Sequence, residues 1–195
     1  MAGIPDDPDA LRRLLPPWAA VSSGRIAHIG RVARLADQWA DAMRVPASER
    51  RRWLRAVFLH DALRDADPAE LLRWAPGERW PPAIRHGPAS AARAEAEGET
   101  DLGVLDAVRY HSVGYEGWDA AGRILYCADF LEPGRAFRRP ERAILAARVP
   151  ADAEGVLREV VRTRLQRAVD KGWPLPDESI RLWNSLAKSS SDASD

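Results

Sequence analysis

The sequence contains little of what disulfide-stabilised, zinc-ribbon or polyanion-binding proteins need. Cys127 is the only cysteine among 195 residues, which excludes an internal disulfide and a cysteine-rich zinc site. The 29 basic residues are balanced by 29 acidic residues, so the formal net charge is zero. This balance argues against a nucleic acid polymer or an anionic membrane as the main partner, because such partners select for a basic excess.

Long apolar runs are also missing. The longest uncharged apolar runs, such as residues 56–59, fall far short of the roughly 20 residues that a bilayer span needs. The first residues lack a basic stretch followed by an apolar one, so we expect no signal peptide. With 46% hydrophobic residues, the chain can still bury one core of ordinary size. We therefore expect a soluble cytoplasmic protein.

Helical periodicity dominates the rest of the sequence. In residues 26–43, for example, apolar side chains recur at intervals of three and four. Asp67 and Asp101 stand where helix N-caps are expected, and prolines open several segments. The pattern predicts helices over residues 9–15, 26–43, 53–63, 68–74, 88–97, 102–111, 119–131, 153–169 and 176–186.

No alternating strand, hairpin signal, internal repeat or nucleotide-binding glycine loop interrupts this pattern. The predicted fold class is therefore all-α, a helical bundle in a single domain. We divide the chain into an N-terminal segment with a short helix (1–24), a helical domain (25–187) and a polar tail that we expect to be disordered (188–195).

Histidine is scarce as well, and its positions carry the strongest functional signal. Four histidines and two aspartates form the ordered series His28, His60, Asp61, His86, His111 and Asp129, on or beside predicted helices. A single histidine on a helix edge is more often a hydrogen-bonded core residue than a ligand. Imidazoles and carboxylates that converge on a bundle core from several helices are, however, the donor set of a metal site. We favour a metal site over six unrelated structural residues.

This series resembles the signature of the HD superfamily of metal-dependent phosphohydrolases, whose adjacent His-Asp pair is here His60-Asp61. More closely, the chain is similar to the symmetrical bis(5'-nucleosyl)-tetraphosphatases of the YqeK type, over roughly residues 9–186. The stretches that carry the resemblance are Phe58-Leu-His-Asp-Ala-Leu-Arg64, His86-Gly-Pro88, Ala107-Val-Arg-Tyr-His111, Tyr126-Cys-Ala-Asp-Phe-Leu-Glu-Pro-Gly-Arg135 and Lys171-Gly-Trp-Pro-Leu-Pro-Asp-Glu-Ser-Ile-Arg-Leu-Trp-Asn184.

The resemblance implies an HD-type bundle that holds two metal ions. The ligands of one metal would be His28, His60, Asp61 and Asp129, and those of the other His86 and His111, with Asp61 bridging. The family implies iron, while mixed nitrogen and oxygen donors also suit manganese. Two cations about 3.5–4 Å apart can lower the pKa of a bridging water, so that the resulting hydroxide attacks phosphorus. Symmetrical cleavage of diadenosine tetraphosphate would then release two ADP.

A tetraphosphate also needs cationic side chains. Beside Asp61 we expect Arg64 as a catalytic residue, and the candidates for substrate binding are Arg25, Arg31, Arg109, Arg135 and Glu132. For each arginine the alternative is a solvated surface residue, and Glu132 could orient a ligand, bind ribose or be a simple helix-end acid. Many relatives carry lysine where Arg64 stands, and two threonines and a basic residue where residues 112–115 read Ser-Val-Gly-Tyr.

Three functions stay open from the sequence. The first is cleavage of a dinucleoside polyphosphate, and the second is cleavage of another nucleotide, such as a mononucleotide or a guanosine alarmone. The third is a metal- or nucleotide-binding module without turnover, which the complete ligand set disfavours. The sequence does not give the oligomeric state, and a homodimer stays open.

Overall fold

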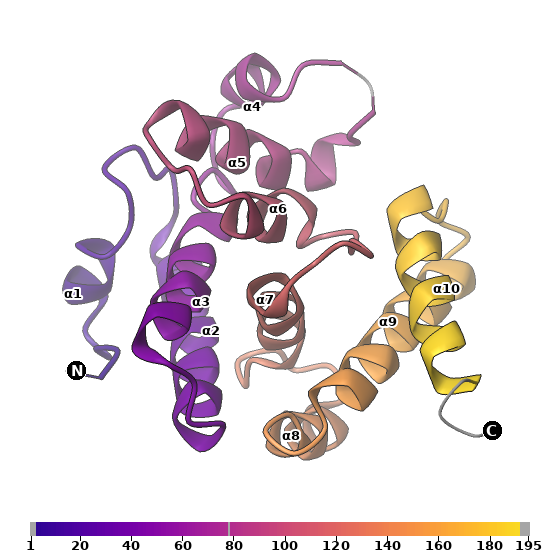
Figure 1. The fold of residues 1–195 in the computed structure, drawn as a ribbon. Helices are drawn as coiled ribbons and strands as arrows, with labels where there is room; N and C mark the ends of the chain where they lie inside the picture. The colour runs from indigo at the N-terminus through magenta and orange to yellow at the C-terminus, as the bar shows by residue number, and fades with distance from the viewer. Residues whose placement is uncertain (1–2, 78, 192–195) are drawn as a thin grey trace.

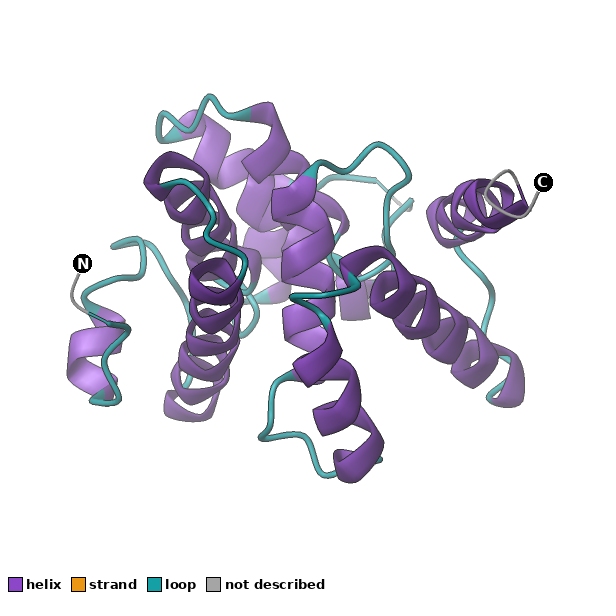
Figure 2. Ribbon diagram, turned by 60° about the horizontal axis from the view of Figure 1, so that its bottom comes forward, coloured by secondary structure: helices purple, strands orange, loops and turns teal. Residues whose placement is uncertain are grey.

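Helices form the regular structure of this protein. The computed structural model describes residues 3–77 and 79–191, and no strand occurs in these ranges, which confirms the all-α prediction (Figures 1 and 2). In chain order the elements are α1 (Pro8–Arg12), α2 (Ser23–Ala42), α3 (Ala47–His60), α4 (Pro68–Trp74), the 3-10 turn η1 (Pro82–Ile84), α5 (His86–Ala96), α6 (Leu102–Tyr110), α7 (Ala120–Leu131), α8 (Arg139–Arg148), α9 (Ala153–Asp170) and α10 (Asp177–Ser191). Over the same ranges, none of the helices is both long and apolar enough to cross a membrane.

Aspartate side chains determine where several helices begin. Asp101, Asp119 and Asp152 are the N-caps of α6, α7 and α9, and each accepts a hydrogen bond from a backbone N–H of the first turn. The guanidinium of Arg52 in α3 forms ion pairs with both Asp101 and Asp119. Because two caps share one cation, the starts of α6 and α7 are fixed relative to α3.

Several helix boundaries differ from the prediction. The largest shift is in α3, which begins at Ala47, before the predicted start at Trp53, and ends at His60 rather than at Leu63. Helix α5 begins at His86 rather than Pro88, because a proline in the first turn needs no partner for a backbone N–H. Helix α8 was not predicted: its apolar stripe is short, and Ile144 within it is 64% exposed. Helix α10 continues past Leu186 to Ser191, so helix occupies 188–191 of the predicted tail, while 192–195 lie outside the described residues.

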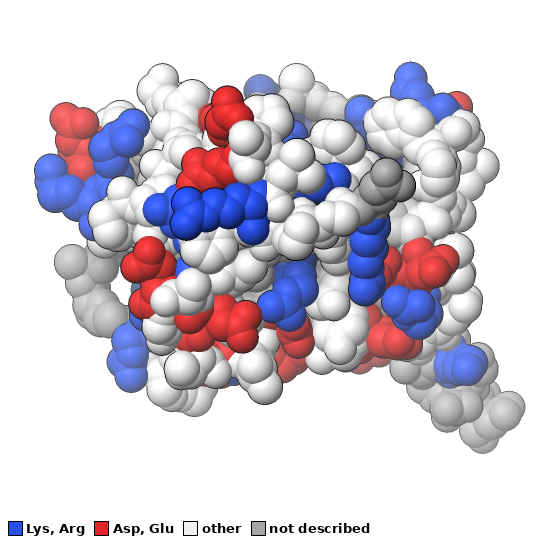
Figure 3. All heavy atoms as spheres, turned by 90° about the horizontal axis from the view of Figure 1, so that it is seen from above, with Lys and Arg blue, Asp and Glu red and all other residues white. Residues whose placement is uncertain are grey.

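Helix α7 lies at the centre of the bundle, where it packs against α2, α3, α6, α8 and α9 (Figure 1). The core around it includes the completely buried Val32, Val57, Val108 and Leu125, from α2, α3, α6 and α7. A polar residue on α7 is therefore enclosed by neighbouring helices. The outside differs: on the face shown in Figure 3, basic and acidic side chains are interspersed rather than gathered by sign.

Candidate metal centre and substrate cleft

The six predicted ligands come together where five helices meet. His28 lies in α2, His60 and Asp61 at the end of α3, His86 at the start of α5, His111 just after α6 and Asp129 in α7. All six are buried, with exposed fractions of 7% or less. Four of them stand at or next to a helix end, where side chains from different helices can approach one point.

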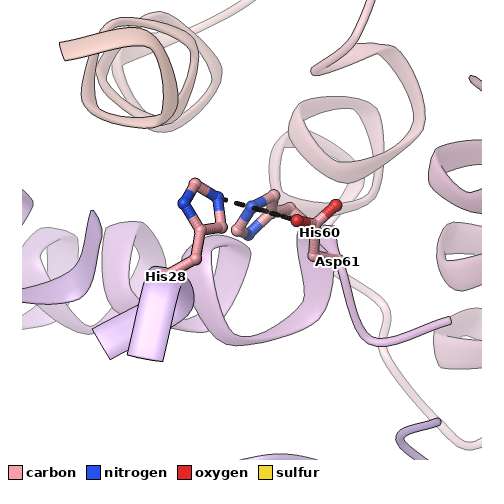
Figure 4. A group of neighbouring side chains, drawn as sticks. All are labelled: His28, His60 and Asp61. Atoms are coloured by element: carbon pink, nitrogen blue, oxygen red, sulfur yellow. Dashed lines mark ion pairs between the residues drawn. The ribbon is translucent and has the colours of Figure 1, made fainter. Parts of the chain in front are cut away.

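His28, His60 and Asp61 form a first group of atoms suited to a metal ion (Figure 4). Asp61 Oδ2 lies 3.6 Å from His28 Nε2 and 3.4 Å from His60 Nε2. Asp129 Oδ1 lies 3.2 Å from His28 Nε2. Two imidazole nitrogens and two carboxylates thus face one another, a donor set that iron and manganese accept.

A second group consists of Asp61, His86 and His111. Asp61 Oδ1 lies 3.1 Å from His86 Nε2 and 3.7 Å from His111 Nε2, and these two nitrogens are 3.1 Å apart. The two oxygens of Asp61 therefore face different pairs of histidines. A carboxylate in this position can bridge two cations.

Hydrogen bonds on the far side of the rings orient most of these histidines. The Nδ1 atoms of His60 and His111 lie 2.6 and 2.8 Å from the carbonyl oxygens of residues 57 and 108, in the preceding helical turn. His28 Nδ1 lies 3.2 Å from Glu132 Oε1. Since each of these oxygens accepts from Nδ1, Nε2 is the ring nitrogen that faces the other ligands and would bind a metal.

His86 is the exception among the four histidines. Arg64 donates to His86 Nδ1 at 3.1 Å and to the carbonyl oxygen of Ala83 at 2.8 Å. In this arrangement the ring proton of neutral His86 is on Nε2. A metal could bind Nε2 of His86 only after that proton has left Nε2. If the proton moves to Nδ1, the hydrogen bond from Arg64 to Nδ1 must break.

Two buried nitrogens show that the residues present fit a metal. His28 Nε2 and His60 Nε2 are inaccessible to solvent and make no well-aligned hydrogen bond among the described residues, although carboxylate oxygens lie 3.2 Å and 3.4 Å away. A buried imidazole nitrogen without a partner is costly, and a cation would satisfy both atoms at once. The first group therefore fits a metal ion by its chemistry as well as by its geometry.

The charges within the cluster match this interpretation. Although burial opposes it, the neighbouring His60 and His86 hold the pKa of Asp61 well below its ordinary value. Burial, together with His86 and His60, lowers the pKa of His111 to about 3. Asp61 is therefore ionised and His111 neutral near pH 7, and these are the forms that bind metals.

His28 and Asp129 depend on each other. Burial lowers the pKa of His28, but the carboxylates of Asp129 and Glu132 outweigh burial and raise it to about 9. The pKa of Asp129 lies well below its ordinary value despite burial, because His28 and two arginines surround it. A metal ion at His28 would thus replace a proton that the metal-free cluster holds.

The cluster opens into a cleft of about 1090 Å³ lined by arginines. Arg25 lies 2.7 Å from Asp61 Oδ2, and Arg135 lies 2.6 Å from Asp129 Oδ1. Arg164 of α9, which the sequence did not single out, lies 2.9 Å from Asp129 Oδ2. These guanidinium groups compensate the buried carboxylates, and all three residues line the cleft.

Two of the predicted substrate-binding arginines are not among the described residues that line the cleft. Arg109 is 3.1 Å from Asp106 and 3.7 Å from Glu95. Arg31 donates to Glu132 Oε2 at 2.5 Å. Glu132, a predicted substrate-binding residue, is 1% exposed, accepts from His28 and is likewise not among the described residues that line the cleft.

Arg142 holds the loop that follows Asp129. This arginine is 3% exposed, and its guanidinium donates to the carbonyl oxygens of residues 130, 132, 135 and 137. The loop carries Glu132, which orients His28, and Arg135, which pairs with Asp129. Sequence reasoning did not identify Arg142, although it fixes the backbone of two candidate site residues.

Comparisons with known proteins show which family the chain resembles. The model of the HD domain family matches residues 25–148. Among curated proteins, the chain is 26% identical over 157 residues to the symmetrical bis(5'-nucleosyl)-tetraphosphatase of Bacillus subtilis, with 76% of this chain and 83% of that protein covered. It is also 26% identical over 104 residues to the enzyme of the same name from Halalkalibacterium halodurans, with 53% and 54% covered.

Among solved structures, the fold is similar to that of an HD superfamily hydrolase from Clostridium acetobutylicum described as involved in NAD metabolism. The TM-score is 0.74 at 22% identity, with 85% of this chain and 89% of that chain covered. This similarity supports the fold.

Proposed function

Since the chain belongs to the HD domain family, we propose that it is a metal-dependent phosphohydrolase that cleaves diadenosine tetraphosphate symmetrically into two ADP. The names of its curated relatives support the substrate, at 26% identity. We further propose that the metal is iron, with manganese as the other metal that the donors suit. A cytoplasmic location and a homodimer stay predictions from the sequence.

The observation that carries the proposal is the position of the Asp61 carboxylate. Its Oδ2 faces His28 and His60, while its Oδ1 faces His86 and His111. When bound, two divalent cations supply an acidified water for attack on phosphorus and positive charge for the phosphate oxygens. The protein supplies a buried and pre-oriented set of donors, and no protein nucleophile is needed.

The arginines of the cleft suit a polyphosphate. Arg64 has no acidic partner among the described residues and lies beside His86, so its charge is available to a phosphate oxygen. Arg25, Arg135 and Arg164 are paired with Asp61 or Asp129. Metal cations bound by Asp61 and Asp129 would neutralise these carboxylates in place of the arginines. The three guanidinium groups would then be available to bind phosphates.

Product analysis tests this function. The metal-loaded protein is incubated with diadenosine tetraphosphate, and the nucleotides are separated by chromatography. We expect ADP alone, whereas AMP plus ATP would contradict symmetrical cleavage. Absence of product would favour another nucleotide as substrate, or a binding module without turnover.

A variant links that activity to the cluster. Asp61→Ala should abolish ADP release and most of the bound metal. Asp37→Ala is the matched control, because Asp37 pairs with Arg50 and is not among the residues that line the cleft. Activity that survives in Asp61→Ala would show that the shared carboxylate is not used.

A further inference from the structure

The substrate cleft extends well beyond the metal cluster. Its volume of about 1090 Å³ is slightly above the range of about 300–1,000 Å³ that is usual for small-molecule sites. Besides His86 and His111, the wall of the cleft includes Trp173, the prolines 174 and 176, and the first turn of α10. A single phosphate would leave this part of the cleft empty, so the wall needs a separate explanation.

Trp173 is the largest side chain of that wall and is 57% exposed. Its backbone is fixed by the end of α9. Gly172 has a φ of +63°, its N–H donates to the carbonyl of Val169, and the N–H of Trp173 donates to the carbonyl of Ala168. Pro174 then restricts the backbone conformation of Trp173 and of the residue that follows it. An exposed aromatic ring on a restrained backbone is a surface prepared for a flat partner.

This wall is also anchored to the metal cluster. Ser179 in α10 donates a hydrogen bond to the carbonyl oxygen of Val113, two residues after His111. Gly114 has a φ of +94° and lies against Leu182 of α10, where an added Cβ would be 2.7 Å from a Leu182 methyl. The segment that carries Trp173 is thus held at a defined position relative to His111.

Helix α9 supplies a further cation to the cleft. Arg167 lines the cleft, has no acidic partner among the described residues, and its guanidinium lies 5.4 Å from the centroid of the Phe137 ring. It follows Arg164, which pairs with Asp129, by nearly one turn of α9, a rise of about 4.5 Å along the axis. Along the chain from Arg164, the lining of the cleft therefore offers a second positive charge and then an aromatic ring.

We propose that Arg167 and Trp173 form a subsite for one nucleoside diphosphate half of the substrate. Arg167 binds the phosphate next to the base-bearing ribose, and the nucleobase stacks on the indole of Trp173. The inference rests on the proposed function, because it explains why the cleft accepts a dinucleoside polyphosphate instead of a single phosphate. Stacking tolerates any base, since every base has a π-face.

The test compares two ligands that differ in the nucleoside. Calorimetry measures the binding of ADP and of inorganic pyrophosphate to the metal-loaded wild type, Trp173→Ala, Trp173→Phe and Arg167→Gln. Trp173→Ala should weaken ADP binding about ten- to hundred-fold and change pyrophosphate binding less than two-fold. Trp173→Phe should restore most of the ADP affinity, and Arg167→Gln should weaken both ligands. The same ADP ranking is expected without metal.

The outcomes separate this subsite from the proposed activity. Three results would overturn the subsite: no ADP binding by the wild type, unchanged ADP binding by Trp173→Ala, or an equal loss of affinity for ADP and pyrophosphate in Trp173→Ala. If the wild type still releases only ADP from diadenosine tetraphosphate, the proposed function stands without the subsite. If ADP binding depends on Trp173 while no ADP is released, the activity fails and the nucleoside subsite stands.

Discussion

Replacing Glu132 by glutamine removes one charge from behind the metal cluster while keeping the shape of the side chain. Glu132 is 1% exposed and accepts hydrogen bonds from His28, from Arg31 at 2.5 Å and from the backbone N–H of Gly134 at 2.6 Å. Burial would raise its pKa, but His28 and Arg31 outweigh burial and lower it to about 2. The residue is thus an ionised acceptor, and an amide cannot accept from all three donors.

The expected loss follows from these contacts. Losing the carboxylate that orients a metal-binding histidine typically costs ten- to hundred-fold in metal affinity, or about 1.4–2.7 kcal/mol. The free energy of unfolding of the metal-free protein should fall by about 1.5–3 kcal/mol, the value of a hydrogen bond to a charged group. Metal affinity is measured by competition with a chelator, and stability by denaturant unfolding.

A matched variant separates the two effects. Glu178 is also buried, at 8% exposure, and its carboxylate pairs with Arg79 at the edge of the cleft. Glu178→Gln should lower stability without changing metal affinity. Wild-type metal affinity in Glu132→Gln, or an equal loss in both variants, would refute the argument that Glu132 acts through His28.

Three further predictions follow from particular contacts. Arg109→Ala should leave the kcat/KM for diadenosine tetraphosphate unchanged, whereas Arg64→Ala should lower it about ten- to hundred-fold in steady-state assays. Arg52 lowers the pKa of Asp101 from 3.8 to about 2. The stability that this pair contributes is therefore complete above pH 4 and is lost as pH falls toward 2. Arg52→Gln should flatten the dependence of the free energy of unfolding on pH in that range, as measured by denaturant unfolding at several pH values. Gly114→Ala should destabilise the protein by about 1–2 kcal/mol, measured by chemical denaturation, because φ is +94° there and a methyl group of α10 blocks the new Cβ.

Most of the fold follows from local signals in the sequence. The periodicity in residues 26–43 and 119–131 and the expected cap Asp101 predicted α2, α7 and α6 to within a few residues. Helix α8 was not predicted because its stability comes from contacts with the rest of the protein rather than from an apolar periodicity in its own sequence. Arg142, one of its residues, donates to carbonyl oxygens of the preceding loop, and no periodicity reveals such bonds.

The part of the candidate site that contains histidine could be predicted, because histidine is rare in this sequence. Four histidines in one ordered series pointed to the cluster, but the arginines did not identify themselves among 29 basic residues. Arg109 lies in the same matching stretch as His111, but two residues earlier, so about 200° of helical rotation directs it elsewhere. Arg164 carried a usable signal, because it follows the buried Val160 and Val161 by four and three residues. A charge on the apolar face of a helix needs a buried partner, which here is Asp129.

Anomalous diffraction from crystals of the protein loaded with iron or manganese tests the two-metal arrangement most directly. We predict two peaks on either side of the Asp61 carboxylate, each about 2.1 Å from the Nε2 atom of at least one of the four histidines. One peak should adjoin His28 and His60, and the other His86 and His111. A single peak, or peaks that leave Asp61 uncoordinated, would contradict the arrangement on which the proposed chemistry depends.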